Sequence, residues 1–199
     1  SPTNVIQEHE FASTGNFNDF GDLSSARNEV SSVSDATRAV ISMANPSAGN
    51  AMEYITMASS GDSIDFGDRY SDEQVGSGGV QSPTRGVFIS GYGASPYPVN
   101  NIMDYLTFST TGNTADFGDA LTAVRYPASA SNAVRGVQCQ GGAPNSHVNT
   151  IEFITIATLG NAQDFGDLTM ADLGFGSGAC SSPTRAVFSN NTETHLDYV

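Results

Sequence analysis

The sequence has no lysine and no tryptophan, and it contains only two cysteines and three histidines among 199 residues. Its seven basic residues are all arginine and face 21 aspartates and glutamates, which gives a formal net charge of −14. A surface this acidic repels phosphate backbones and anionic lipids, so we expect neither nucleic-acid binding nor membrane insertion. No apolar run of about 18 residues is present, so no membrane-spanning helix is predicted.

The few cysteines and histidines form no catalytic or metal-binding pattern. Cys139 and Cys180 lack the spacing of metal ligands, and the sequence leaves both a disulfide and two free thiols open. His9, His147 and His195 stand outside any Ser-His-Asp arrangement or histidine-rich segment. Catalysis needs a nucleophile, a base and a stabilising group that converge. The sequence therefore predicts no catalytic residue and a protein that is not an enzyme.

What the sequence does contain is a tetrapeptide that occurs four times. Its copies are Asp19-Phe20-Gly21-Asp22, Asp65-Phe66-Gly67-Asp68, Asp116-Phe117-Gly118-Asp119 and Asp164-Phe165-Gly166-Asp167. Successive copies are about 48 residues apart, and repeats of about this period are typical of propellers and solenoids.

Two further motifs keep the same period. An arginine follows each tetrapeptide in segments such as Pro83-Thr84-Arg85-Gly86-Val87, and the four arginines are Arg38, Arg85, Arg135 and Arg185. An aromatic segment precedes each of the last three copies, as in Met52-Glu53-Tyr54-Ile55-Thr56, and 5–9 holds this place in the first. We therefore predict a single repeat domain over 1–199, with four repeats of about 48 residues at approximately 4–49, 50–99, 100–148 and 149–190 and the start of a fifth at 194–199.

The repeats have the composition of short strands and turns. The segment 54–58 is β-branched and aromatic and is followed by turn residues. A glycine stands five residues before each tetrapeptide Phe, at Gly15, Gly61, Gly112 and Gly160, where a hairpin turn needs positive φ. We predict an all-β chain in which tandem four-stranded repeats form a β-propeller or a propeller-like array. A β-solenoid is the alternative.

The tetrapeptide has two interpretations. In the favoured one it is structural: Phe fills the space between neighbouring sheets, Gly permits a close approach of two backbones, and one Asp pairs with the repeated Arg. Under this interpretation Arg85→Ala destabilises the protein markedly. In the other interpretation the two carboxylates bind calcium. Calcium loops usually supply four or more oxygens in alternation, so we predict no cofactor and keep calcium as the alternative.

The segments between the motifs differ in sequence and length from repeat to repeat. They contain Tyr92, Tyr97 and Tyr126, together with several asparagines. Loops on a rigid scaffold are where recognition tends to reside, and aromatic side chains beside amides suit sugars or a protein surface. These three tyrosines are the predicted binding residues.

The motifs resemble those of one group of proteins. The order acidic-aromatic-Ile-Thr, then Gly-x-x-x-Asp-Phe-Gly-Asp-Leu, then Ser-x-Thr-Arg-Gly-Val-Phe is similar to repeat proteins of marine bacteriophages, especially those that infect cyanobacteria. The resemblance covers nearly the whole chain and is clearest at 164–169 and 182–188. The repeats are also similar, more distantly, to kelch repeats, which form propellers. The Gly-Gly pair that kelch repeats carry after the Val-Phe strand is found at that place only at Gly141-Gly142, and tryptophan is absent.

The bacteriophage resemblance implies a non-enzymatic virion structural or host-recognition module, such as part of a tail fibre, an appendage or a surface decoration. It implies a place on a virion or outside a cell, with other virion proteins, copies of itself, or a host surface glycan or protein as partners. The alternative is a secreted, lectin-like propeller that binds carbohydrate. A lectin of this kind predicts four matching pockets, whereas the loops differ between repeats.

Overall fold

The computed structural model describes residues 2–43, 49–71, 75–93, 98–139, 141–142, 148–169, 178–189 and 196–199. Within these residues the chain forms seventeen β-strands and no helix, in agreement with the predicted all-β class. It follows that no helix in this part of the chain could cross a membrane.

The strands form five antiparallel sheets, named here in chain order. The first sheet has two strands, the second, third and fourth sheets have four each, and the fifth has three. Their bounds are β1 (Thr3–Glu8) and β2 (Asn18–Arg27); β3 (Ser31–Ser34), β4 (Arg38–Ser42), β5 (Ala51–Thr56) and β6 (Ile64–Asp68); β7 (Gly78–Gln81), β8 (Arg85–Tyr92), β9 (Val99–Thr107) and β10 (Ala115–Asp119); β11 (Ala128–Ser131), β12 (Arg135–Cys139), β13 (Thr150–Thr155) and β14 (Gln163–Asp167); β15 (Ala179–Ser181), β16 (Ala186–Ser189) and β17 (Leu196–Tyr198).

In each four-stranded sheet, neighbours in sequence are neighbours in space. The repeated arginine begins the second strand, the aromatic segment forms the third, and the tetrapeptide lies on the fourth. A sheet therefore takes its first two strands from the end of one sequence repeat and its last two from the start of the next. In the same scheme β1 and β2 are a third and a fourth strand, and β15 to β17 are a first, a second and a third.

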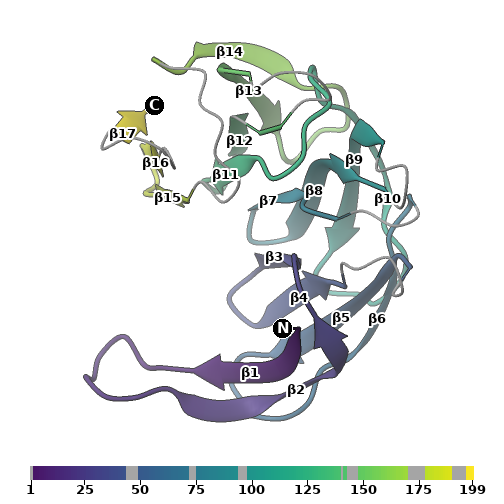
Figure 1. The fold of residues 1–199 in the computed structure, drawn as a ribbon, viewed down its shortest axis with the longest axis vertical. Coiled ribbons are helices and arrows are strands. Elements are labelled where there is room, and N and C mark those ends of the chain that lie inside the picture. Colours follow the sequence, from purple (N-terminus) through teal and green to yellow (C-terminus); the bar gives the residue numbers. More distant parts are fainter. Residues whose placement is uncertain are drawn as a thin grey trace.

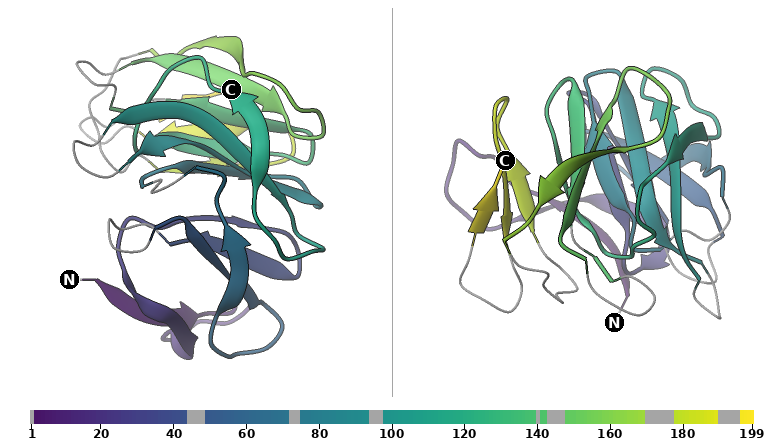
Figure 2. Two further views of the ribbon diagram at one scale, coloured as in Figure 1. Left: turned by 90° about the vertical axis from the view of Figure 1, so that its right-hand side faces the viewer. Right: turned by 90° about the horizontal axis from the view of Figure 1, so that it is seen from above.

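The five sheets stand side by side along an open arc (Figure 1). The first strands β3, β7, β11 and β15 lie on the concave side, where β7 contacts both β3 and β11, and β15 contacts β11. The N-terminal hairpin and the fifth sheet lie at opposite ends of the arc. Figure 2 shows from above that successive sheets face one another.

The hydrophobic core is divided among the interfaces between sheets. Phe66 of the second sheet is 2% exposed and clusters with Phe88, Leu106 and Phe108 from the third sheet. Phe117 is likewise 2% exposed and clusters with Ile154 and Ile156 from the fourth sheet. The prediction that the tetrapeptide Phe fills the space between sheets is confirmed at these two positions.

The tetrapeptide glycine permits two backbones to meet. Gly67 has φ +134°, and a Cβ at this position would lie 2.5 Å from the carbonyl carbon of Gly112 in the next sheet. Gly112 itself has φ +148°, as predicted for the glycine that precedes the tetrapeptide, whereas Gly15 lacks the predicted positive φ. Any side chain at Gly67 would therefore push the two sheets apart, which confirms the predicted close approach.

The same contact carries three hydrogen bonds, which we name the clasp. Gly112 N donates to Phe66 O (2.7 Å), Thr114 N donates to Asp68 O (2.9 Å), and Asp68 N donates to Asn113 Oδ1 (3.0 Å). The clasp recurs between the first and second sheets and between the third and fourth, through 61–63 and 160–162. In the second, third and fourth sheets a hairpin turn is thus fixed to the tetrapeptide strand of the sheet before it.

The predicted pairing of the repeated arginine with a tetrapeptide Asp is wrong. Arg85 stacks on Tyr105, with its Cζ 4.5 Å from the ring centroid, and its Nη1 donates to Ile156 O at 2.9 Å. Arg38, Arg135 and Arg185 stack in the same way on Tyr54, Phe153 and Tyr198. The reason is topological: the third strand, which carries the aromatic ring, lies between the arginine strand and the tetrapeptide strand.

Candidate functional site

Two of the three predicted binding tyrosines lie together, on the side of the arc at which the first strands of the sheets begin. Tyr92 Oη lies 2.6 Å from Glu29 Oε2, to which it donates, and 2.8 Å from Tyr126 Oη. The two rings are 5.6 Å apart, and Arg125 lies 5.8 Å from the centroid of the Tyr92 ring. We name Glu29, Tyr92, Arg125 and Tyr126 the tyrosine cluster. Tyr97, the third predicted residue, lies outside the described residues.

Three sheets build this cluster through one backbone feature. In each of these sheets the residue two positions before the first strand has positive φ. The values are +59° at Glu29, +61° at Gly76 and +55° at Tyr126. Glycine adopts this conformation freely, whereas Glu and Tyr pay about 1–2 kcal/mol for it. The Tyr126 ring lies against Gly76, where a Cβ would come within 2.7 Å of it. Glu29 and Tyr126 therefore hold strained backbone conformations that glycine would adopt without strain.

The phenols of the tyrosine cluster are neutral hydrogen-bonding groups. Burial and the hydrogen bond to the Glu29 carboxylate raise the pKa of Tyr92 far above its usual value. Burial also raises the pKa of Tyr126. A tyrosine nucleophile needs the opposite shift, because the phenolate is the reactive form. The tyrosine cluster thus offers half-exposed rings, hydroxyl groups and one carboxylate for binding.

A groove of about 450 Å³ lies at the other end of the first strands. It is lined by the turns that join the first and second strands of four sheets, at 34–36, 81–83, 131–133 and 181–183. Asp35, Ser82, Asn132 and Ser182 each accept two backbone N–H groups within their own turns. Half of the polar side chains that line this groove are therefore engaged in holding the turns.

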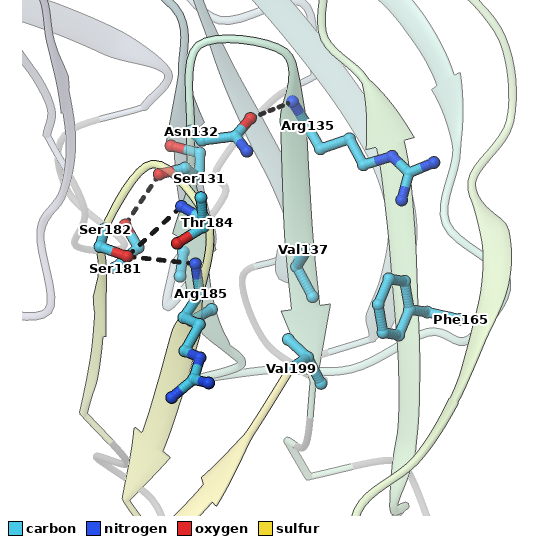
Figure 3. Close-up of a pocket in the computed structure, with 12 residues that line it drawn as sticks. Ser131, Asn132, Arg135, Val137, Phe165, Ser181, Ser182, Thr184, Arg185 and Val199 are labelled. Atoms are coloured by element: carbon cyan, nitrogen blue, oxygen red, sulfur yellow. Dashed lines mark hydrogen bonds between the residues drawn. The ribbon is translucent and has the colours of Figure 1, made fainter.

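A smaller cavity of about 130 Å³ lies between the fourth and fifth sheets (Figure 3). Val137, Phe165 and Val199 supply apolar walls, and Arg135 and Arg185 also line it. Phe165 is 41% exposed here, although it is the counterpart of the buried Phe66 and Phe117. The predicted role of the tetrapeptide Phe is thus incomplete at its last copy.

Buried carboxylates on the third strands form a repeated feature that the sequence analysis missed. Asp104 is fully buried and pairs with Arg69 at 2.5 Å, the one ion pair found within the described ranges. Glu53 accepts hydrogen bonds from Ser24 and Ser63. Burial raises the pKa of Glu53, but these hydrogen bonds outweigh it and hold the pKa below its usual value. The acidic residue before each aromatic was visible in the repeat and could have indicated these groups.

Glu152 is the third such carboxylate, and none of the described residues places a cation beside it. Its Oε1 accepts from Gln138 Nε2 at 2.9 Å, and its Oε2 accepts from Leu121 N at 2.5 Å. Burial nevertheless raises the pKa of Glu152. All three carboxylates face neighbouring sheets rather than a cavity that a substrate could enter, so we assign them to the fold.

The remaining predicted residues bring no second centre together. His9 contacts Phe17 in the N-terminal hairpin, and His147 and His195 lie outside the described residues. Cys139 is buried and Cys180 is exposed, and neither forms a disulfide in the described structure, which answers the question that the sequence left open. In the part of the chain that the structure covers, no three His, Cys, Asp or Glu side chains are close enough to hold a metal ion.

No family model and no curated protein sequence matches this chain. Among solved structures, the one titled "Structure of YjhT" superposes with a TM-score of 0.71 at 8% sequence identity. The match covers 87% of this chain and 62% of that one, so this chain spans less than two thirds of its length. At this identity the likeness shows a shared all-β fold of repeated antiparallel sheets.

Proposed function

We propose that this chain is a non-enzymatic recognition module, that its arc of sheets is part of a β-propeller, and that the tyrosine cluster binds its partner. Four-stranded antiparallel sheets that stand side by side, with their first strands on the concave side, are the arrangement a propeller uses. A linear solenoid lacks this arrangement of separate four-stranded sheets.

The observation that carries the recognition role is the strained pair Glu29 and Tyr126. Backbone strain of this kind clusters at active sites, ligand-binding sites and switch regions. Two rings and their hydroxyl groups, beside one carboxylate, suit the stacking and hydrogen bonding by which proteins hold sugars. The equivalent positions of three sheets carry Glu, Gly and Tyr, so among the described residues the site is single and asymmetric.

The setting of this role follows from the resemblance to marine bacteriophage proteins. We place the module on a virion, in a tail fibre, an appendage or a surface decoration, where it contacts a host glycan or protein or neighbouring virion proteins. A single asymmetric site favours this over a secreted lectin with four matching pockets. A tail or capsid gene beside this reading frame would support the virion role, and a secretion leader would contradict it.

Binding to immobilised bacterial surface glycans and to whole cyanobacterial cells tests the site directly. Tyr126→Gly removes the ring and relaxes the backbone, so we expect binding to fall at least tenfold while the melting temperature is kept. Tyr92→Phe removes only the bridging hydroxyl and should weaken binding less. Tyr70→Phe, at an exposed tyrosine outside the cluster, is the control. Binding that survives Tyr126→Gly, or no binding by the unaltered protein, overturns the proposal.

A further inference from the structure

The fourth sheet ends in the strand β14, and the described residues place no hairpin against it. Phe165 O, Asp167 N and Asp167 O correspond to the groups that form the clasp at Phe66 and Asp68. Gly166 keeps the conformation of Gly67, with φ +143°, yet a Cβ at Gly166 would meet no atom within 4 Å. The strand β14 is therefore shaped for a neighbouring hairpin that none of the described residues provides.

The cavity in Figure 3 marks where that hairpin would insert a side chain. Its walls Ala130, Val137 and Phe165 correspond to Val33, Val40 and Phe66, which cluster with Phe108 of the next sheet. They also correspond to Val80, Val87 and Phe117, which cluster with Ile156. The arginines beside those two filled sites donate to Phe108 O and Ile156 O. By analogy, the cavity beside Arg135 should receive an apolar side chain, and Arg135 should donate to the backbone carbonyl of that residue.

The N-terminal hairpin carries the matching residues. Glu8 pairs with Asn18 in the same way that Tyr105 pairs with Ala115, so the two hairpins align residue by residue. In this alignment Phe11 corresponds to Phe108. Gly15 and Asn16 correspond to Gly112 and Asn113, which form the clasp. Phe11 is fully exposed, and β1 has no strand on its other edge in the described structure.

We propose that the β1–β2 hairpin of a second copy of this chain docks on β14 and fills the cavity with Phe11. Gly15 N and Asn16 Oδ1 then form the clasp with Phe165 O and Asp167 N. The incoming β1 pairs with β16 and β2 lies outside it, which gives the four-stranded order β15-β16-β1-β2. The partner is a second copy because the two ends of one chain lie at opposite ends of the arc (Figure 1).

In the single copy β17 holds the third place, beside β16, and the incoming β1 displaces it. Val187 pairs with Tyr198 as Val137 pairs with Phe153, so the site already has the register that β1 needs. The strand β17 is short, and the side chains of Leu196 and Tyr198 are exposed. Each copy is strongly acidic, so we expect association to strengthen as salt screens the repulsion. This self-assembly does not depend on the recognition role.

Disulfide trapping tests the contact in the full chain, in a Cys180→Ser background. Asn16→Cys and Asp167→Cys are both exposed in the single copy and meet only if the hairpin docks. The two proteins, mixed with oxidised glutathione, should give a linked heterodimer. The control mixes Asn16→Cys with Asp119→Cys, whose backbone N already binds Asn161. No link in the first mixture, or equal linking in the control, overturns the proposal. The proposal is also overturned if a chain that carries both Asn16→Cys and Asp167→Cys forms the disulfide within one monomer.

Sedimentation over a range of protein and salt concentrations gives an independent measurement. Phe11→Ser should raise the dissociation constant at least tenfold without lowering the melting temperature, because the side chain is exposed in the single copy. Leu159→Ser, at an exposed apolar residue in the turn of the fourth sheet, should leave association unchanged. A protein that stays monomeric at every concentration, or equal weakening by both substitutions, contradicts the docking.

Discussion

Removing Arg69 should unfold the protein far more readily than removing any exposed arginine. The Arg69 side chain is 1% exposed, and its Nε and Nη2 hold the Asp104 carboxylate at 3.1 and 2.5 Å. Its Nη1 donates to Ser77 Oγ at 2.8 Å, and its Cζ lies 4.7 Å from the centroid of the Phe88 ring. Arg69→Leu leaves a buried carboxylate with Thr114 as its remaining hydrogen-bond donor.

Breaking one side of a buried ion pair costs about 3–5 kcal/mol. For a chain of this length each kcal/mol lowers the melting temperature by about 2–4 °C, so Arg69→Leu should lower it by about 6–20 °C. Leucine itself fits the position, because the tetrapeptide is followed by Leu23 and Leu168 in two other repeats. The loss then comes from the orphaned charge rather than from a packing defect.

A double-mutant cycle separates these two causes. Asp104→Leu alone should cost as much as Arg69→Leu, whereas the two changes together should lie within about 2 kcal/mol of the unaltered protein. Urea unfolding followed by circular dichroism, with tyrosine fluorescence as a second probe, measures all four proteins. If Arg69→Leu costs less than about 1 kcal/mol, or if the double variant costs the sum of the two, the buried pair does not act as described.

Three further predictions follow from the sheet interfaces. Because burial raises the pKa of Glu152, the folded state loses stability as pH rises from the usual glutamate range through that raised pKa. In melting curves, Glu152→Gln should therefore be more stable than the unaltered protein at neutral pH and should lose this difference in acid. Arg85→Ala should cost about 1–3 kcal/mol in urea unfolding, whereas Arg135→Ala, at an exposed arginine, should cost less than about 1; equal losses would contradict the role of the Ile156 carbonyl. Phe117→Ala should cost about 3–5 kcal/mol and Phe165→Ala much less in the single copy, and a similar loss at both would show that Phe165 is already covered.

Sequence recurrence predicted the structural units better than it predicted how they join. Four copies of one tetrapeptide implied four equivalent strands, and the roles of Phe66 and Gly67 follow from their chemistry alone. Recurrence gives a period but no starting point, because it says nothing about which strands share hydrogen bonds. The division into repeats at 4–49 and onward therefore falls inside the sheets, between β4 and β5 in the second one.

The partner of the repeated arginine was predicted wrongly for a related reason. Opposite charge pointed to an Asp of the tetrapeptide, but Arg85 and that Asp are on strands that are not neighbours. The ring of Tyr105, already part of the third motif, was the closer group. Partner choice depends on strand order, which the sequence does not state.

Divergence between repeats pointed to Tyr92 and Tyr126 as binding residues, and the structure brings the two into contact. It could not indicate Glu29, which joins them from another sheet, because that contact depends on how three sheets are arranged. The glycine at Gly76 was a usable signal, since it marks a position at which the backbone favours glycine and two equivalent residues are not glycine.

The offset between sequence repeats and sheets has a consequence for how such genes change. Because each four-stranded sheet is shared by two neighbouring repeats, unequal recombination that inserts or removes one full period rejoins a second strand to a third strand of the same kind. The breakpoint can fall anywhere within the period without creating a hybrid of unlike parts. Lineages can therefore lengthen or shorten the arc in single steps while each junction keeps its packing.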